Sequence, residues 1–471
     1  MTARLWTADW IHHQGTFRAD HALLVDDEGR VAAIGPRAEV EASPAAAGAA
    51  RRDLTGRAIA PGTVSAHSHA FQVFLRGAGD HPRSFADWVT RVLYPVALAL
   101  DDQALEAASL LCFAQMARAG ITTVGEFHYL HNGADFGARG EDLAQIVIGA
   151  ARAVGVRIAL IDALYDVARR PGQRRMTRTV EDAVASVRRL AAATADDPAV
   201  TVLPAAHSLH GATREAVEAA AALARELDCR WHIHLAEQRG DAAHSQEAHG
   251  GRPLNVLERW DVLDARTVLV HGIWLTPDEQ ALLAARGAAL VSNPTTNMAL
   301  GDGVAPLPAL IEHGVPVALG TDMNAAPNVF QEIRVAEHLQ RVQALEMGCL
   351  PRARGDDPPD AQRLFAMGTR WGGEALGLKV GALEVGWWAD LLVLDLEDPS
   401  LLPAALLGGD ALLNALSSSM VPQTAIEEAW VGGRQVIADG ALTGIEPAAL
   451  AAKVRAARRS AMAAADGLAA P

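Results

Sequence analysis

From residue 59 to about residue 380, short apolar runs alternate with longer amphipathic stretches. This alternation predicts strands followed by helices, and therefore a parallel sheet, because consecutive parallel strands need a long crossover between them. Eight repeats of this kind predict an α/β fold in which the strands close into a (β/α)8 barrel of the TIM type. The expected strands span residues 61–67, 121–126, 156–163, 200–206, 229–235, 267–271, 288–292 and 315–321.

A doubly wound open sheet is the alternative arrangement of the same repeats. That fold carries a glycine-rich phosphate-binding turn after its first strand. Here the first expected strand leads into His67-Ser68-His69 instead, which favours the closed barrel. The helical stretches carry start signals of their own, including Asp101-Asp102 and the capping box Thr276-Pro277-Asp278-Glu279.

The two ends of the chain have a different, strand-rich pattern. Residues 1–58 contain an expected hairpin, and residues 381–446 contain another around Gly432-Gly433. We expect these two parts to form one small β-sandwich domain beside a barrel of residues 59–380. Residues 447–471 are rich in alanine and predict a C-terminal helix.

Composition excludes several classes of function. The net charge of −15 argues against a nucleic-acid or membrane-surface role, and the sequence holds neither a membrane-spanning apolar stretch nor a signal-peptide pattern at its N-terminus. Its three cysteines lie far apart, as in proteins of a reducing compartment. We therefore expect a cytoplasmic protein whose partner is a small-molecule substrate.

Polar side chains gather where the expected strands end. A barrel places its active site at the carboxyl ends of its strands, and nearly half of the 17 histidines fall there. Singly, each is an ordinary polar residue at a strand exit, but their shared position predicts a metal-dependent hydrolytic site. The residues concerned are His67, His69, Glu126, His128, His207, His210, His232, His234, Glu237, His271 and Asp322.

Four of these residues suit a single divalent metal ion. His67 and His69 are two positions apart, so they point to the same side of a strand. His234 is preferred over His232 because it lies nearer the strand end, and Asp322 follows the last strand. Such a set leaves room for a water molecule, whose pKa a bound metal lowers from ~15.7 toward ~7. Zn²⁺ is expected, although a site of three nitrogens and one oxygen also accepts Fe²⁺ or Mn²⁺.

Three residues have the chemistry to move protons. Asp322 accepts hydrogen bonds when ionised, so it can take a proton from water as well as bind the metal. Glu237 lies three residues after His234, where it can pass a proton to a leaving nitrogen. His271 can polarise the attacked carbon or orient the water. We predict Glu237, His271 and Asp322 as catalytic residues.

The ligand pattern resembles the amidohydrolase superfamily, in its mononuclear-metal deaminase branch. His67-Ser68-His69, His234, His271 and Thr321-Asp322 carry that resemblance, which covers nearly the whole chain. Longer pieces are similar to the formimidoylglutamate deiminase family: residues 67–72, 126–129, 207–209, 232–238 and 300–303. The resemblance implies Zn²⁺ at His67, His69, His234 and Asp322, with catalysis by Glu237 and His271. It also implies a homodimer, although the sequence reveals no interface.

Five residues are expected to bind the substrate. The resemblance implies this role for Gln72, Tyr129 and His207, whereas His210 and Asn297 are candidates by their position.

The chain departs from the deiminase pattern where that family binds carboxylates. His210 and Val89, which follows Trp88, stand where the family has arginines, and neither binds a carboxylate as arginine does. Arg76, Arg83 and Arg91 are nearby replacements, although each is also an ordinary surface charge. Residues 292–297 resemble those of chlorohydrolases and nucleobase deaminases instead.

These observations lead to one main hypothesis and two alternatives. The main hypothesis is a metal-dependent deaminase or deiminase that attacks an amidine-like carbon and releases ammonia, acting on formimidoylglutamate or a related formimino compound. The first alternative keeps this chemistry but takes a purine, pterin or triazine as substrate. The second is a catalytically inactive barrel that serves as a binding protein.

Overall fold

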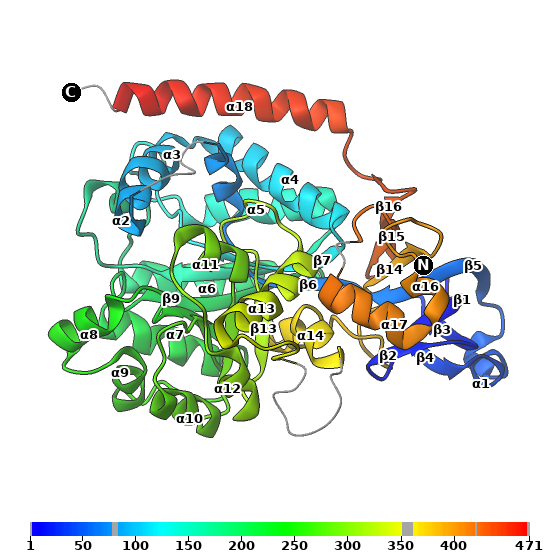
Figure 1. Ribbon diagram of the computed structural model, residues 1–471. Helices are drawn as coiled ribbons and strands as arrows, with labels where there is room; N and C mark the ends of the chain where they lie inside the picture. The colour runs from blue at the N-terminus through cyan, green and yellow to red at the C-terminus, as the bar shows by residue number, and fades with distance from the viewer. Residues whose placement is uncertain (1, 78–82, 351–360, 420–421, 469–471) are drawn as a thin grey trace.

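The computed structural model describes residues 2–77, 83–350, 361–419 and 422–468, and its main body is a parallel β-barrel (Figure 1). The eight strands lie in sequence order around the barrel. All eight strands predicted from the sequence are confirmed. They are β6 (Thr63–Ser68), β7 (Ile121–His128), β8 (Arg157–Leu164), β9 (Val200–Ser208), β10 (Trp231–Leu235), β11 (Thr267–His271), β12 (Ala289–Ser292) and β13 (Val317–Leu319).

The barrel closes where the chain after β13 meets β6. Thr321 N donates to His67 O at 3.0 Å, and His69 N donates to Asp322 O at 2.9 Å. Ser68 and Asp322 form a parallel bridge. Closure excludes the open-sheet alternative, and it brings the ends of the first and last strands side by side.

Helices surround the barrel, and their start signals are those seen in the sequence. The carboxylate of Asp101 accepts a hydrogen bond from Ala104 N at the start of α4, and Thr276 with Glu279 forms the predicted capping box of α10. The longer helices are α4 (Asp102–Arg118), α5 (Gly140–Val154), α6 (Val180–Ala193), α7 (Arg214–Glu226), α10 (Pro277–Ala285) and α13 (Val329–Ala344).

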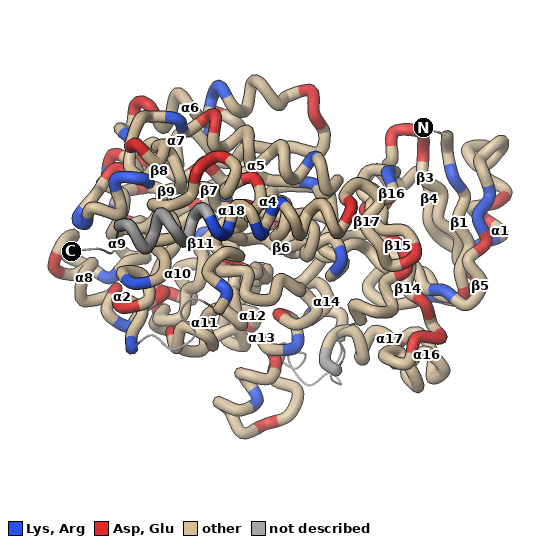
Figure 2. The backbone as a smooth tube through the Cα atoms, turned by 90° about the horizontal axis from the view of Figure 1, so that it is seen from above, with Lys and Arg blue, Asp and Glu red and all other residues tan. Residues whose placement is uncertain are grey.

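Acidic and basic residues alternate over this outer layer (Figure 2). Arg188 on α6 pairs with Glu226 on α7 at 2.7 Å, and Arg189 pairs with Glu141 on α5 at 2.5 Å. These pairs are open to solvent, which screens their charges, so they add little to stability. None of the described helices is long and apolar enough to cross a membrane.

Both chain ends contribute to a second, nine-stranded sheet. β5 from the N-terminal part pairs antiparallel with β14 from the C-terminal part. Trp6 and Trp430 pack edge to face at 5.1 Å although β5 and β14 separate their strands, which requires the sheet to curl over a shared core. Its strands are β1 (Arg4–His13), β2 (Thr16–Arg18), β3 (His21–Val25), β4 (Val31–Pro36), β5 (Ala50–Pro61), β14 (Leu391–Asp395), β15 (Ile426–Val431), β16 (Arg434–Ala438) and β17 (Ala441–Leu442).

The last helix, α18 (Pro447–Leu468), lies along the outside of the barrel against α3 (Tyr94–Ala99) and α4 (Figure 1). Lys453 on α18 pairs with Glu106 on α4 at 2.5 Å. The C-terminal helix predicted from the sequence is therefore present, and it packs on the barrel.

Candidate metal centre and active site

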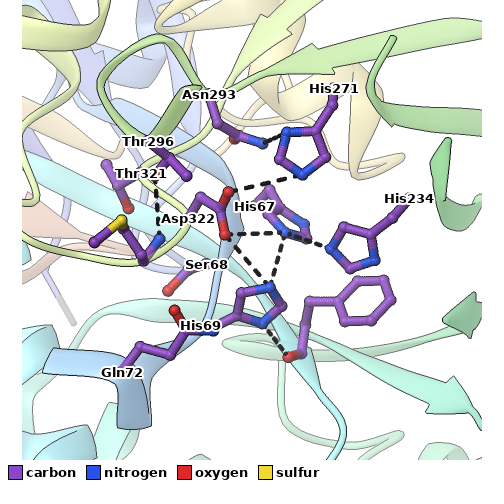
Figure 3. A network of polar contacts seen from close by, with 12 residues as sticks. His67, Ser68, His69, Gln72, His234, His271, Asn293, Thr296, Thr321 and Asp322 are labelled. Carbon is purple, nitrogen blue, oxygen red and sulfur yellow. Dashed lines mark hydrogen bonds and ion pairs between the residues drawn. The ribbon is translucent and has the colours of Figure 1, made fainter. Parts of the chain in front are cut away.

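Three imidazole nitrogens meet at the carboxyl end of the barrel (Figure 3). His67 Nε2 lies 3.2 Å from His69 Nε2 and 3.1 Å from His234 Nε2. Among the described residues, this is the one group of three or more His, Cys, Asp or Glu side chains with the geometry to hold a metal. The two histidines of β6 and the preferred histidine of β10 therefore come together, whereas His232 is fully buried one layer deeper in the barrel.

The surroundings of the histidines determine which nitrogen carries the proton. His69 Nδ1 donates to Phe127 O at 3.0 Å, and His234 Nδ1 donates to His207 O at 2.8 Å. Both Nε2 atoms are then unprotonated acceptors, and each lies within 3.2 Å of His67 Nε2. Burial lowers the pKa of His69 to about 3 and that of His234 well below its usual value, so both imidazoles are neutral. Three imidazole nitrogens this close together, two of them fixed as acceptors, fit a bound cation.

Asp322 completes this group from the other side of the barrel closure. Its Oδ1 lies 3.4 Å from His69 Nε2 and 3.7 Å from His67 Nε2. Burial is the main cause that raises the pKa of Asp322 to about 7, and a cation beside it would oppose that shift. Gly320 is needed nearby because a Cβ there would lie 2.8 Å from the Cβ of His67. A donor set of three imidazoles and one carboxylate fits a divalent zinc, iron or manganese ion.

His271 lies between the two carboxylates of the site. Its Nε2 is 3.8 Å from Asp322 Oδ2 and 3.8 Å from Glu237 Oε1. Its Nδ1 is 3.1 Å from Asn297 Oδ1 and 3.4 Å from Asn293 Nδ2. The backbone at His271 has φ +77°, and at Asp322 φ is +45°. Strained backbone of this kind persists where the surrounding contacts hold a functional side chain in place.

Glu237 reaches the site from the loop after β10. Burial is the first cause that raises the pKa of Glu237 to about 8, and the nearby charge of Asp241 raises it further. Burial therefore favours the protonated form of this carboxyl, the form that can donate a proton.

Several supporting residues were missed or undervalued by sequence reasoning. Glu126, seen there only as a strand-end residue, accepts hydrogen bonds from Ser68 Oγ and Ala70 N, both at 2.7 Å, and so fixes the loop that carries His69. Asn293 lies 3.4 Å from His271, and Asp241 binds the backbone of Glu237. Asn293 stood within a noted stretch of the sequence, but no signal in the sequence pointed to Asp241.

A cavity of about 380 Å³ opens over these residues, and four of the five expected substrate-binding residues line it. Asn297 does not: it lies behind His271, to which it is hydrogen bonded. The walls are mainly apolar or aromatic. Its lining includes His69, Gln72, Phe85, Trp88, Val89, Leu93, Tyr94, Tyr129, Tyr165, Arg170, Met176, His207, His210, Glu237, Asp241, His271, Leu300, Asp322 and Met323.

The arginines near the first strand do not line this cavity. Arg76 donates through Nε to Asn324 O at 3.1 Å, Arg91 pairs with Asp87 at 2.6 Å, and Arg83 is exposed. Instead, Arg170 from the loop after β8 is the one arginine or lysine among the described lining residues. Sequence reasoning missed it because loops far apart in the sequence form the rim.

The chain is similar to a known family and to several known proteins. The family described as "Amidohydrolase family" matches residues 58–440. A 5-methylthioadenosine/S-adenosylhomocysteine deaminase of Nitratidesulfovibrio vulgaris is 33% identical, over 93% of this chain and 92% of the relative. A formimidoylglutamate deiminase of Pseudomonas aeruginosa is 32% identical, over 92% of this chain and 97% of the relative.

The fold of this chain matches that of a solved structure over nearly its whole length. The crystal structure of an adenosine deaminase from Xanthomonas campestris with bound zinc superposes with a TM-score of 0.83 at 26% identity. The match covers 98% of this chain and 99% of that one. The likeness therefore includes the small β domain as well as the barrel.

Proposed function

The chain belongs to the amidohydrolase family and is a hydrolytic deaminase of C–N bonds, and we propose that its substrate is an aminated heterocycle of the adenosine type. The observation that carries this substrate class is the cavity above the histidine cluster, whose walls are mainly apolar and aromatic. Apolar walls stabilise a flat ring with an apolar substituent, whereas a substrate with two carboxylates needs cationic partners.

His67, His69, His234 and Asp322 are the residues that would hold the metal ion. A divalent ion bound there supplies Lewis acidity, which makes water a nucleophile near neutral pH. The chain's own residues then have to orient the substrate and move protons.

We assign two proton transfers to carboxyl groups. Asp322 accepts a proton from the attacking water, and Glu237 donates its proton to the amino nitrogen of the substrate. Water oxygen bonds to the ring carbon, the C–N bond breaks, and ammonia leaves. His271 is placed between both carboxylates, so its Nε2 can form a hydrogen bond with the attacking water and hold it in line.

The cavity wall supplies the binding surface for the heterocycle. Gln72 Nε2 donates to the Tyr129 hydroxyl at 2.9 Å, while the buried Gln72 Oε1 has no partner among the described residues. An N–H group of a substrate ring is a suitable donor to that free oxygen. Tyr165 packs against His207 at 4.1 Å between ring centres, so these two rings form one firm side of the cavity.

Formimidoylglutamate is the second candidate substrate, and two observations favour it. The relative of Pseudomonas aeruginosa carries that activity in its name, and Arg170 on the cavity rim is a partner for one carboxylate. The second carboxylate of that substrate has no arginine or lysine among the described lining residues.

Ammonia release from the zinc-loaded enzyme distinguishes the two substrates. We expect turnover of 5-methylthioadenosine or adenosine with kcat/KM at least tenfold above that of formimidoyl-L-glutamate. Faster turnover of formimidoyl-L-glutamate would contradict the proposed substrate class and leave the chemistry intact. The variant Glu237→Gln is the control for both, because it removes the proton donor and keeps the shape of this lining side chain.

A further inference from the structure

The turn that carries Glu237 is held by a carboxylate that is four residues further along the chain. Asp241 Oδ2 accepts hydrogen bonds from Glu237 N at 2.9 Å and from Gln238 N at 3.0 Å. Asp241 is the first residue of α8 (Asp241–His249). A single oxygen therefore fixes two consecutive amides, including that of the predicted proton donor.

The other oxygen of Asp241 is bound by a histidine from a different strand end. His210 Nε2 lies 3.0 Å from Asp241 Oδ1, and the His210 backbone is itself held by Ser208 Oγ at 3.2 Å. The His210 ring packs on His244 of α8 with 4.4 Å between ring centres. The carboxylate thus links the loop after β9 to the loop after β10.

This turn needs such support because its backbone is strained. Ala236, the residue before Glu237, has φ +53°, a conformation that costs about 1 kcal/mol or more for a residue with a Cβ atom. Hydrogen bonds on the next two amides oppose relaxation of the turn. Gln238 is also anchored through its side chain, which donates to Asp302 Oδ1 at 2.5 Å.

We propose that Asp241, supported by His210, is a positioning residue that holds Glu237 in its proton-donating place. The inference rests on the proposed function, in which Glu237 delivers the proton. It also gives His210 a different role from the one predicted from the sequence, because His210 would act on Asp241 rather than bind substrate. Positioning partners of this kind typically change activity by about 10–100-fold when they are removed.

Steady-state kinetics of Asp241→Ala test the proposal. With the faster of 5-methylthioadenosine and formimidoyl-L-glutamate as substrate, we expect kcat to fall about 10–100-fold while KM stays within about twofold. Asp241→Asn keeps one oxygen for the two amides, so it should recover kcat to within about fivefold of wild type. A rise in KM with unchanged kcat would overturn the proposal, because it would mean that Asp241 contacts the substrate.

A second variant tests whether the effect passes through Glu237. In the background of Glu237→Gln, the added change Asp241→Ala should lower activity by less than about twofold, because residues that act through one another are not additive. An unchanged 10–100-fold loss in that background would overturn the proposal.

Asp166→Ala is the matched control. Its carboxylate also accepts a backbone hydrogen bond at the rim of the barrel, from Thr213 N at 2.8 Å, but it does not line the cavity. We expect its kcat to match that of wild type. A loss of activity equal to that of Asp241→Ala would show a general effect on rim loops and overturn the proposal.

Hydrogen exchange of the intact chain separates this inference from the proposed function. In Asp241→Ala, and not in Asp166→Ala, the amides of Glu237 and Gln238 should exchange about tenfold faster. If the wild-type protein deaminates neither compound, the proposed function fails, and this measurement still decides whether Asp241 holds the turn. Unchanged exchange at both amides would overturn the inference.

Discussion

The floor and the outer wall of the cavity are built in opposite ways. The floor is formed by side chains from widely separated strands: His67, His69, His234, His271 and Asp322. Backbone carbonyls or carboxamides orient several of them, and two sit on strained backbone. Much of the wall comes from one continuous stretch, α2 (Phe85–Trp88), η3 (Val89–Leu93) and α3. Its cavity-facing side chains are mainly apolar, and packing holds most of them.

This contrast separates the chemistry from the choice of substrate. The floor requires each atom in one place, because metal binding and proton transfer depend on distances of a few tenths of an ångström. The wall requires only a shape and an apolar surface, which several combinations of side chains provide. Changes in the floor should therefore abolish the reaction, whereas changes in the wall should change the affinity for substrate and the preference between substrates.

The largest effect is expected from removal of a floor histidine. His69→Ala removes one of the three nitrogens, so metal content should fall from one ion per chain toward zero and activity by at least about 1000-fold. Elemental analysis measures the metal content, and ammonia release measures the activity. His313→Ala, an exposed histidine away from the site, is the control and should retain metal. Full metal content in His69→Ala would contradict the ligand assignment.

Glu237→Gln should cost about 100–10,000-fold in kcat, since it removes one proton donor but no metal ligand. Metal content and KM should stay close to those of wild type, which distinguishes this variant from His69→Ala. More than one tenth of the wild-type kcat, measured under saturating substrate, would mean that another group delivers the proton.

A change in the wall should be milder and of a different kind. Trp88→Ala removes a buried aromatic surface, so kcat/KM should fall about 10–100-fold, mainly through KM. Metal content should not change, and the ratio of rates with 5-methylthioadenosine and formimidoyl-L-glutamate should shift. Trp10→Ala in β1 is the control for loss of a tryptophan. A loss in Trp88→Ala confined to kcat would contradict the distinction between floor and wall, because it would mean that a wall residue acts in the chemical step.

The smallest effect concerns the support behind the wall. Glu332 on α13 is buried and accepts a hydrogen bond from Thr295 N at 2.9 Å, next to cavity residue Thr296. Burial raises the pKa of Glu332 to about 8 from an ordinary 4.5. The folded protein then binds a proton that the unfolded chain has lost, so this contribution to stability declines as pH rises from about 4.5 to about 8.

Glu332→Gln removes this titration and keeps the shape of the side chain. Its Tm relative to wild type should rise between pH 5 and pH 8, by an amount equivalent to about 1 kcal/mol per pH unit. Thermal unfolding of both proteins across that range measures the difference. If the Tm of the two proteins changed with pH in the same way, Glu332 would be ionised in the folded protein from pH 5 to pH 8.

Floor residues were easier to predict from the sequence than wall residues. The strand-end histidines were visible because they follow short apolar runs and because a barrel brings all such ends to one rim. Val89 was noticed only as a departure from a family pattern, and the wall residue Trp88 only as the residue before it. Arg170 and Asp241 were not predicted, since their importance depends on loops that meet only after folding.

The sequence by itself determined the strands, their order, the small β domain from both chain ends and the candidate metal ligands that the barrel brings together. These features follow from local periodicity and from residue types that few other roles explain. Tertiary structure alone decided that Asn297 supports His271 from behind, that Arg76 and Arg91 turn away from the cavity, and that Asp241 holds the turn of Glu237. Such contacts join loops from different repeats, and their geometry depends on barrel closure rather than on any local pattern.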